Sequence, residues 1–244
     1  HRVHRRQRQM CIRDSNIIVK NNSKISQDGS GLFFASLNNT WLETKINVAG
    51  TTNIDWVIDN FYKNPKKYSE KIKIINNFEK KYLTFKYPEN SLIFLPYINY
   101  GGSISPFVNL NSKAEIFGIL PHHNNFDIMT ACYEGLALSI KDCYANKIKT
   151  KDSLYVAGGA SKSKILPQLI SNALNIKVKI LTNSELGALG ISFLIDSCLN
   201  KKDLKKLIND HQKIGHFYTP NKNHSKYLNN KYHKYKKLRM SLNN

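Results

Sequence analysis

The segment 153–192 constrains the fold of this chain more than any other. An apolar run over 154–157 is followed at once by Gly158 and Gly159, which predicts a strand that ends in a sharp turn. A second apolar run over 178–181 predicts another strand. Between the two strands, apolar residues recur every three or four positions, which predicts a helix packed on a sheet; they are Leu166, Leu169, Ile170, Ala173 and Leu174.

The two glycines of the turn allow a ligand to approach the backbone closely, because glycine has no Cβ. The helix that follows is predicted to present its N-terminal amide groups, around residues 161–163, to a molecule in the turn. Gly187 and Gly190 belong to the next predicted helix and should let it lie close to its neighbours. A tight connection in any α/β domain has the same pattern, so the turn by itself does not identify a ligand.

The flanking residues make this segment resemble the adenosine-binding motif of the FGGY carbohydrate kinases, which belong to the actin/sugar-kinase/Hsp70 superfamily. In that family a Gly-Gly-Ala turn lies against the nucleotide, and a Gly-Ala-Leu-Gly helix follows one strand later. Residues 158–160 and 187–190 match these two motifs in order and separation. Further similarities are Gly50 followed by Trp56, the proline-aromatic loop 95–107, the strand 116–119, and Glu134-Gly135 in a long helix.

The resemblance covers about residues 30 to 240 and corresponds to the C-terminal half of the family pattern. It implies an α/β fold of the ribonuclease H type, with a mixed sheet flanked by helices. It also implies ATP and Mg²⁺ as cofactors, and a ketose (pentulose) or a polyol as the small-molecule substrate of a kinase. We expect a nucleotide-binding domain over 16–200 and a basic helical tail of the same domain over 201–244.

The resemblance also implies which residues contact the nucleotide: Gly50, Asp55, Gly158, Gly159, Ala160 and Ser163. Ser163 stands where related kinases have Asn. Asp55 has an alternative interpretation as a first-turn acid that the helix dipole favours. We expect no catalytic residue in this chain, because the catalytic Asp and the phosphate loop of the family should lie upstream of Asn16. The pair Asp28-Gly29 is better explained by turn chemistry.

The formal net charge of +20 is concentrated at the two ends of the chain. Residues 1–15 carry five Arg and one Asp, and residues 201–244 carry twelve Lys or Arg and two Asp, so the other 185 residues carry only +6. Because residues 1–15 are rich in Arg where the rest is rich in Lys, we interpret them as a non-native segment, with a basic arm as the alternative. A basic nucleic-acid-binding module remains an alternative function.

The cysteines and the apolar content indicate a cytoplasmic globular protein. The chain is 41% hydrophobic, has no apolar run of the roughly 18 residues that a membrane helix needs, and shows no secretory signal. Its four cysteines form no CxxC pair and are expected to be buried free thiols; they are Cys11, Cys132, Cys143 and Cys198.

The remaining elements follow from apolar patterning and turn residues. We expect strands over 16–20, 31–36, 41–48 and 91–96, helices over 51–62, within 64–90 and over 126–146, and a loop over 97–111.

Three other groups of residues have both a structural and a functional interpretation. His122-His123 precede Asn124-Asn125, which is typical of a loop with a helix-capping Asn, with a metal or catalytic pair as the alternative. Glu134 is either a buried carboxylate hydrogen-bonded to a neighbouring turn or a phosphate-proximal group. The tyrosines and lysines of 226–237 predict an amphipathic helix with its Tyr rings inward and its Lys outward.

Two further alternatives concern the protein as a whole. A non-catalytic relative of the sugar kinases remains possible on this pattern, and a homodimer is left open. We expect the isolated chain to lack kinase activity.

Overall fold

The structure is a computed structural model, and the residues that it describes are 15–24, 28–35, 40–47, 50–63, 65, 67–85, 91–144, 153–182, 186–211 and 214–241. Residues 1–14, with Cys11 and most of the predicted non-native segment, lie outside the described part. The first half of the described chain contains β1 (Ser15–Lys20), β2 (Gly31–Ala35), β3 (Thr40–Ile46), α2 (Thr52–Phe61), α3 (Tyr68–Thr84), β4 (Ile93–Leu95) and β5 (Glu115–Phe117). The second half contains α4 (Asn125–Tyr144), β6 (Ser153–Val156), η2 (Gly159–Lys162), α5 (Leu166–Leu174), β7 (Lys177–Leu181), α6 (Leu186–Leu199), α7 (Leu204–His211), β8 (Ile214–Tyr218) and α8 (Lys222–Ser241).

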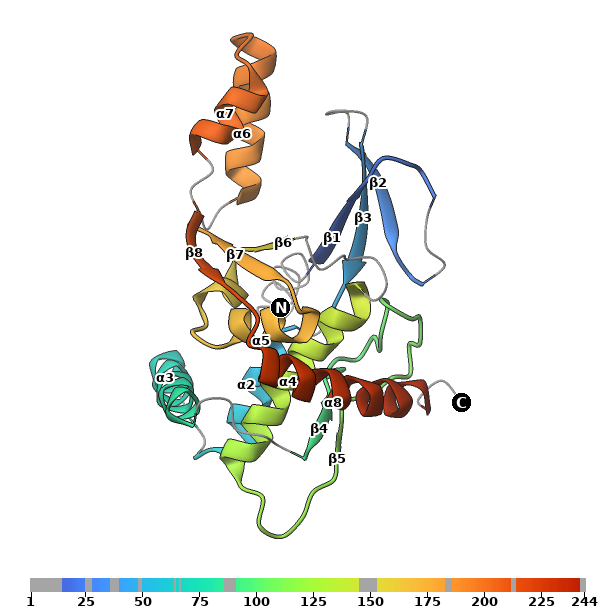
Figure 1. The fold of residues 1–244 in the computed structure, drawn as a ribbon, viewed down its shortest axis with the longest axis vertical. Helices are drawn as coiled ribbons and strands as arrows, with labels where there is room; N and C mark the ends of the chain where they lie inside the picture. The colour runs from blue at the N-terminus through green and yellow to red at the C-terminus, as the bar shows by residue number, and fades with distance from the viewer. Residues whose placement is uncertain are drawn as a thin grey trace.

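The described strands form three separate sheets (Figure 1). One is antiparallel with the order β1-β3-β2, and a second pairs β4 with β5. The third has the order β6-β7-β8, in which β6 and β7 are parallel and β8 is antiparallel to β7. The parallel pair β6-β7 is connected through α5, as the alternating pattern of 153–181 predicts, so the expected strand–turn–helix–strand unit is confirmed.

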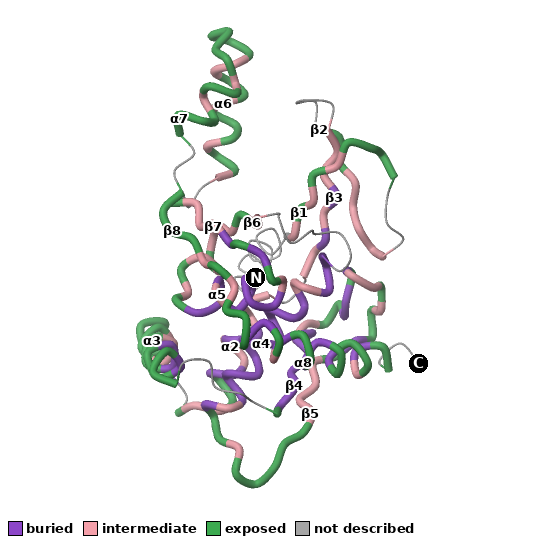
Figure 2. The backbone as a smooth tube through the Cα atoms, in the orientation of Figure 1, coloured by how far each residue is buried: buried purple, intermediate pink, exposed green. Residues whose placement is uncertain are grey.

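Helix α4 is the central element of the core (Figures 1 and 2). Sixteen of its twenty residues are buried, so it is covered on almost every side rather than on a single apolar face. It packs against α2, α5, α8 and strand β4. Such close approach requires a small residue: a Cβ placed on Gly135 would lie 2.3 Å from the backbone oxygen of Phe94 in β4. The Glu-Gly pair of this helix therefore includes a glycine that packing demands.

Helix α8 is attached to α4 by two ion pairs between buried side chains. Lys231 pairs with Glu134, and Arg239 Nε lies 2.8 Å from Asp142 Oδ2. The hydroxyl of Tyr232 also donates to Asp142 Oδ1, at 2.6 Å. The predicted inward Tyr face is confirmed for Tyr232 and Tyr235, but the predicted outward orientation is wrong for Lys231, which is only 6% exposed because it neutralises Glu134. Glu134 is buried, as its structural interpretation expects, but its partner is Lys231 of α8 rather than a neighbouring turn.

Helices α6 and α7 project away from the rest of the molecule (Figures 1 and 2). Neither helix has a buried residue, and the apolar side chains of Ile191 and Leu199 are exposed. The prediction that Gly187 and Gly190 allow close packing is wrong here, since a Cβ on either glycine would have no atom within 4 Å. Of the described cysteines, Cys132 and Cys143 are buried as expected, whereas Cys198 in α6 is exposed.

None of the described helices combines the length and the apolar character that crossing a bilayer requires. The strands and helices predicted between residues 16 and 146 are found with boundary shifts of a few residues, and 97–111 is irregular apart from an isolated bridge between Ser103 and Asn109.

Replacing Gly135 by Ala should destabilise the fold by about 1–3 kcal/mol, because the added methyl group cannot be placed without moving β4. Gly190→Ala in α6 is the matched control, since it adds the same methyl group to a helix in open space and should stabilise by up to ~1 kcal/mol. Urea unfolding of both variants measures the difference. Equal stability of Gly135→Ala and the parent chain would contradict the packing argument.

Candidate nucleotide site

The turn at the end of β6 has the backbone geometry that the sequence predicts for close ligand approach. Gly158 has φ 76° and ψ −148°, a region that residues with a Cβ rarely adopt. Gly159 then opens the short helix η2. A Cβ on either glycine would have no atom within 4 Å, so both backbone positions face open space. A ligand could therefore lie directly against this turn.

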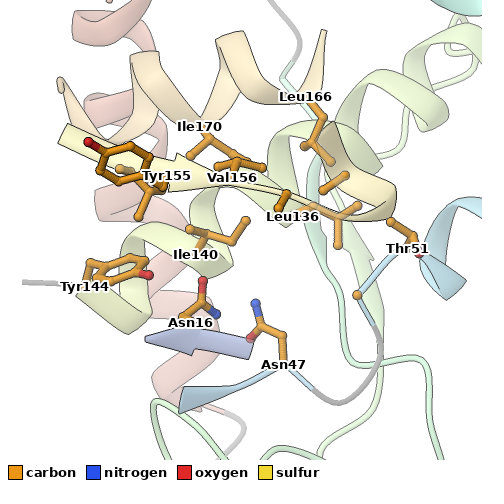
Figure 3. Close-up of a pocket in the computed structure, with 14 residues that line it drawn as sticks. Asn16, Asn47, Thr51, Leu136, Ile140, Tyr144, Tyr155, Val156, Leu166 and Ile170 are labelled. Carbon is orange, nitrogen blue, oxygen red and sulfur yellow. The ribbon is translucent and has the colours of Figure 1, made fainter. Parts of the chain in front are cut away.

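A cavity of about 130 Å³ adjoins the turn and lies between the β1–β3–β2 sheet and the β6–β7–β8 sheet (Figure 3). At one end it is lined by Gly50, Thr51, Ala157 and Ala160. Its walls are mostly apolar, and they are formed by Leu136 and Ile140 of α4, Leu154 and Val156 of β6, and Leu166 and Ile170 of α5.

Polar groups enter this cavity from the side of β1 and β3, where Asn16 and Asn47 point into it (Figure 3). The amide of Asn47 is held by α4, because its Nδ2 donates to Ser139 Oγ at 3.3 Å. Among the described residues, no acid, lysine, arginine or histidine lines the cavity. The cavity is thus suited to holding a ligand through shape and neutral polar contacts rather than to transferring protons.

The structure brings together four of the six predicted site residues. Gly50 and Ala160 line the cavity, and Gly158 and Gly159 form the adjacent turn. Gly50 has a positive φ of 22°. Its position is fixed by the buried Asn53, whose side-chain amide donates to the oxygens of Gly50 and Pro96 at 2.8 and 3.3 Å. The segment that contains Gly50 and the segment that contains Ala160 are far apart in the sequence, and they meet at one end of the cavity.

Ser163, the fifth predicted residue, is directed away from the cavity. Its hydroxyl donates to the buried carboxylate of Glu79, and it accepts from the amide of Leu166 at 3.0 Å. The amide of Lys164 donates to the same carboxylate at 3.1 Å. The helix whose N-terminal amides were expected around 161–163 begins only at Leu166, because η2 intervenes.

Asp55, the sixth predicted residue, lies on the outer side of α2 and does not line the cavity. Its Oδ1 is 4.0 Å from Nζ of Lys71 in α3. Partial burial raises the pKa of Asp55, the Lys71 ammonium lowers it, and the neighbouring Asp59 raises it. This placement agrees better with the alternative interpretation of Asp55 as a first-turn helix acid.

Glu79 is a positioning residue that the sequence analysis missed. It is 2% exposed, and its carboxylate joins α3 to the segment 163–164 and, through the Tyr133 hydroxyl at 3.5 Å, to α4. Burial is the main cause that raises the pKa of Tyr133, and the Glu79 charge adds to it. The sequence did contain a signal that Glu79 is buried. Glu79 lies four residues after Ile75, next to Phe78 and three residues before Tyr82, so it belongs to the apolar side of the helix.

The described residues provide no ligand set for a metal ion, since no cluster of three or more His, Cys, Asp or Glu has suitable geometry among them. His122 and His123 precede α4, where Oδ1 of Asn124 accepts from the amide of Phe126 at 2.9 Å. The helix-capping interpretation of this loop is therefore confirmed.

Solved structures with a similar fold are sugar kinases. The xylulose kinase of Lactobacillus acidophilus has a TM-score of 0.78 at 20% identity, covering 93% of this chain and 45% of that one. A Plasmodium falciparum glycerol kinase, solved with ADP, has a TM-score of 0.69 at 19% identity, covering 91% of this chain and 45% of that one. At these identities the likeness shows the fold, and the predicted fold of the actin/sugar-kinase/Hsp70 superfamily is confirmed.

Residues 16–194 match the FGGY family of carbohydrate kinases, C-terminal domain. The chain therefore belongs to the FGGY family of carbohydrate kinases. It is 26% identical to an erythritol kinase of Brucella abortus over 174 residues, which is 70% of this chain and 33% of that protein. It is 25% identical to a probable L-xylulose kinase of Haemophilus influenzae over 195 residues, which is 79% of this chain and 37% of that protein. The chain thus spans about a third of these relatives.

Ser163→Ala should lower the free energy of unfolding by about 0.5–2 kcal/mol, because it removes the hydroxyl that caps α5 and binds Glu79. Affinity for ATP should change less than twofold, since the hydroxyl does not face the cavity. Urea unfolding and calorimetric titration with ATP measure the two effects. A large loss of ATP affinity without a loss of stability would instead place Ser163 in contact with the nucleotide.

Proposed function

We propose that this chain is the nucleotide-binding C-terminal part of an ATP-dependent carbohydrate kinase. The adenosine lies against the turn of Gly158 and Gly159 and reaches the end of the cavity lined by Gly50 and Ala160. The observation that carries the proposal is the open space in front of both glycines, at the end of β6 in a domain of this family. ATP supplies the phosphoryl group that such an enzyme transfers.

The acceptor in the complete protein is a ketose, such as a pentulose, or a polyol. This proposal is supported by the relatives, which are named erythritol kinase and probable L-xylulose kinase. The buried free thiols of Cys132 and Cys143 favour a reducing compartment, which supports a cytoplasmic location. Mg²⁺ remains a prediction of the family resemblance, and the described residues offer it no ligand set.

Gly159→Leu tests the nucleotide position. A Cβ atom on residue 159 would meet no protein atom within 4 Å, and the φ of Gly159 is not in the left-handed region, so the variant should fold. The leucine would occupy the space assigned to the nucleotide, so ATP affinity should fall at least about tenfold. Calorimetric titration of the 244-residue chain with ATP measures this loss.

Gly101→Leu is the matched control, because Gly101 is exposed, has only one atom within 4 Å of its Cβ position, and does not line the cavity. Thermal unfolding of both variants separates misfolding from lost binding. Unchanged ATP affinity in a folded Gly159→Leu variant would refute the proposed site.

The chain alone should bind ATP without transferring its phosphate to a sugar. Phosphoryl transfer to a hydroxyl usually needs a carboxylate that accepts the proton, and no acid among the described residues lines the cavity. A coupled assay of ADP release with ketopentoses and polyols should show no sugar-dependent turnover. Turnover that requires the sugar would show that the chain contains its own catalytic base.

A further inference from the structure

A second pocket, of about 570 Å³, lies where the start of α4, the start of β4 and one face of α8 meet. It is lined mainly by polar side chains: Ser91, His122, His123, Asp127, Tyr227, Asn230, Lys231 and Lys234. Helix α4 also lines the nucleotide cavity, but through Leu136, Ile140 and Tyr144 near its other end. Nine residues of helix separate Asp127 from Leu136, the nearest of these, so the two sites are about 14 Å apart along α4.

One stripe of α8 forms the basic wall of this pocket. Tyr227, Lys231 and Lys234 are spaced by four and three residues, which places them on one helix face. Lys231 is 6% exposed and is held in position by Glu134 and by the hydroxyl of Tyr227, to which its Nζ donates at 3.3 Å. Lys234 lies one turn further along, is exposed, and lines the mouth of the pocket.

The opposite wall presents a hydroxyl group as a donor. The amide of Leu120 donates to His123 Nδ1 at 2.8 Å, so a neutral His123 ring carries its hydrogen on Nε2. That nitrogen lies 3.3 Å from Ser91 Oγ, which then accepts from it. The hydroxyl hydrogen of Ser91 is left to donate into the pocket.

Four backbone amides at the start of α4 already have partners within the segment 124–128. The amides of Phe126, Asp127 and Ile128 donate to the side chain or backbone oxygen of Asn124, and the amide of Asn124 donates to Asp127 Oδ2 at 2.9 Å. The binding groups of the pocket are its side chains. Its lining carries two lysines and one carboxylate, Asp127, which already accepts a backbone hydrogen bond. Lys231 is neutralised by its ion pair with Glu134, so the positive charge offered to a ligand comes mainly from Lys234.

We propose that this pocket binds a small phosphorylated metabolite through its phosphate group. The ammonium group of Lys234 and the hydroxyl of Ser91 line it on two sides, and the Lys231 ammonium, held by Glu134, keeps a further N–H donor at the wall. Charge-assisted hydrogen bonds of this kind favour a phosphate group. The volume exceeds that of a phosphate group alone, so the organic part of a monoester fits beside Tyr227 and Asn230. The site is separate from the nucleotide turn and does not depend on the proposed kinase activity.

The test uses the 244-residue chain, with glycerol 3-phosphate and inorganic phosphate as probes at constant ionic strength. Two-dimensional ¹H–¹⁵N NMR should show saturable shifts of the backbone amides of His122, His123 and Asp127. Lys234→Gln should weaken binding about tenfold, because it removes one charge-assisted hydrogen bond. Lys236→Gln is the charge-matched control: residue 236 is exposed, lies almost opposite on α8, and does not line the pocket, so binding should not change.

Ser91→Ala provides a second variant that leaves the buried ion pair intact, and it should also weaken phosphate binding. Equal weakening by Lys234→Gln and Lys236→Gln would overturn the proposal, since the binding would then follow net charge. Binding of glycerol as tight as that of glycerol 3-phosphate would also overturn it, because recognition would not involve the phosphate. Saturable shifts confined to residues 157–160 would assign the anion to the nucleotide turn instead.

Discussion

The burial of α4 on almost every side is the constraint on which the rest of the structure depends. A helix in this position must place small residues where other elements cross it, and it must neutralise any charge that it carries inward. Gly135 meets the first requirement against β4. Glu134 and Asp142 meet the second through Lys231 and Arg239 of α8. Because breaking a buried ion pair leaves an uncompensated charge, α8 is an integral part of this core rather than an appended basic tail.

The same helix borders both candidate ligand sites. Its C-terminal half forms one wall of the cavity beside the Gly158–Gly159 turn, and its first turn borders the polar pocket against α8. Glu79 joins α3 to residues 163–164, which follow the turn and η2, and it contacts Tyr133 of α4. Side chains that never face the cavity thus keep its lining in place, which is the kind of support that a preformed binding site needs.

The local elements of the fold were predictable from the sequence, because strands, turns and amphipathic helices leave periodic patterns over a few residues. The unit from β6 to β7 is an example, with Leu169 and Ile170 buried as their spacing predicts. The partners of buried charges were not predictable, since Glu134 and Lys231 are 97 residues apart in the chain and no local pattern connects them. Ser163 was assigned by resemblance to the nucleotide, although its hydroxyl binds Glu79 in this fold.

The cavity beside the Gly158–Gly159 turn and the pocket beside α8 differ in the charge of their lining residues, so they suit different ligands. A cavity that no acid, lysine, arginine or histidine lines among the described residues can select a nucleotide by the shape of its walls and its backbone, but it gives little stabilisation to charge that develops on a transferring phosphoryl group. If the cavity holds the nucleotide as proposed, the acid–base and electrostatic groups for phosphoryl transfer must come from outside it. The pocket beside α8 has ammonium and hydroxyl donors but no glycine turn. These groups suit the binding of an anion that does not react, rather than the transfer of a phosphoryl group.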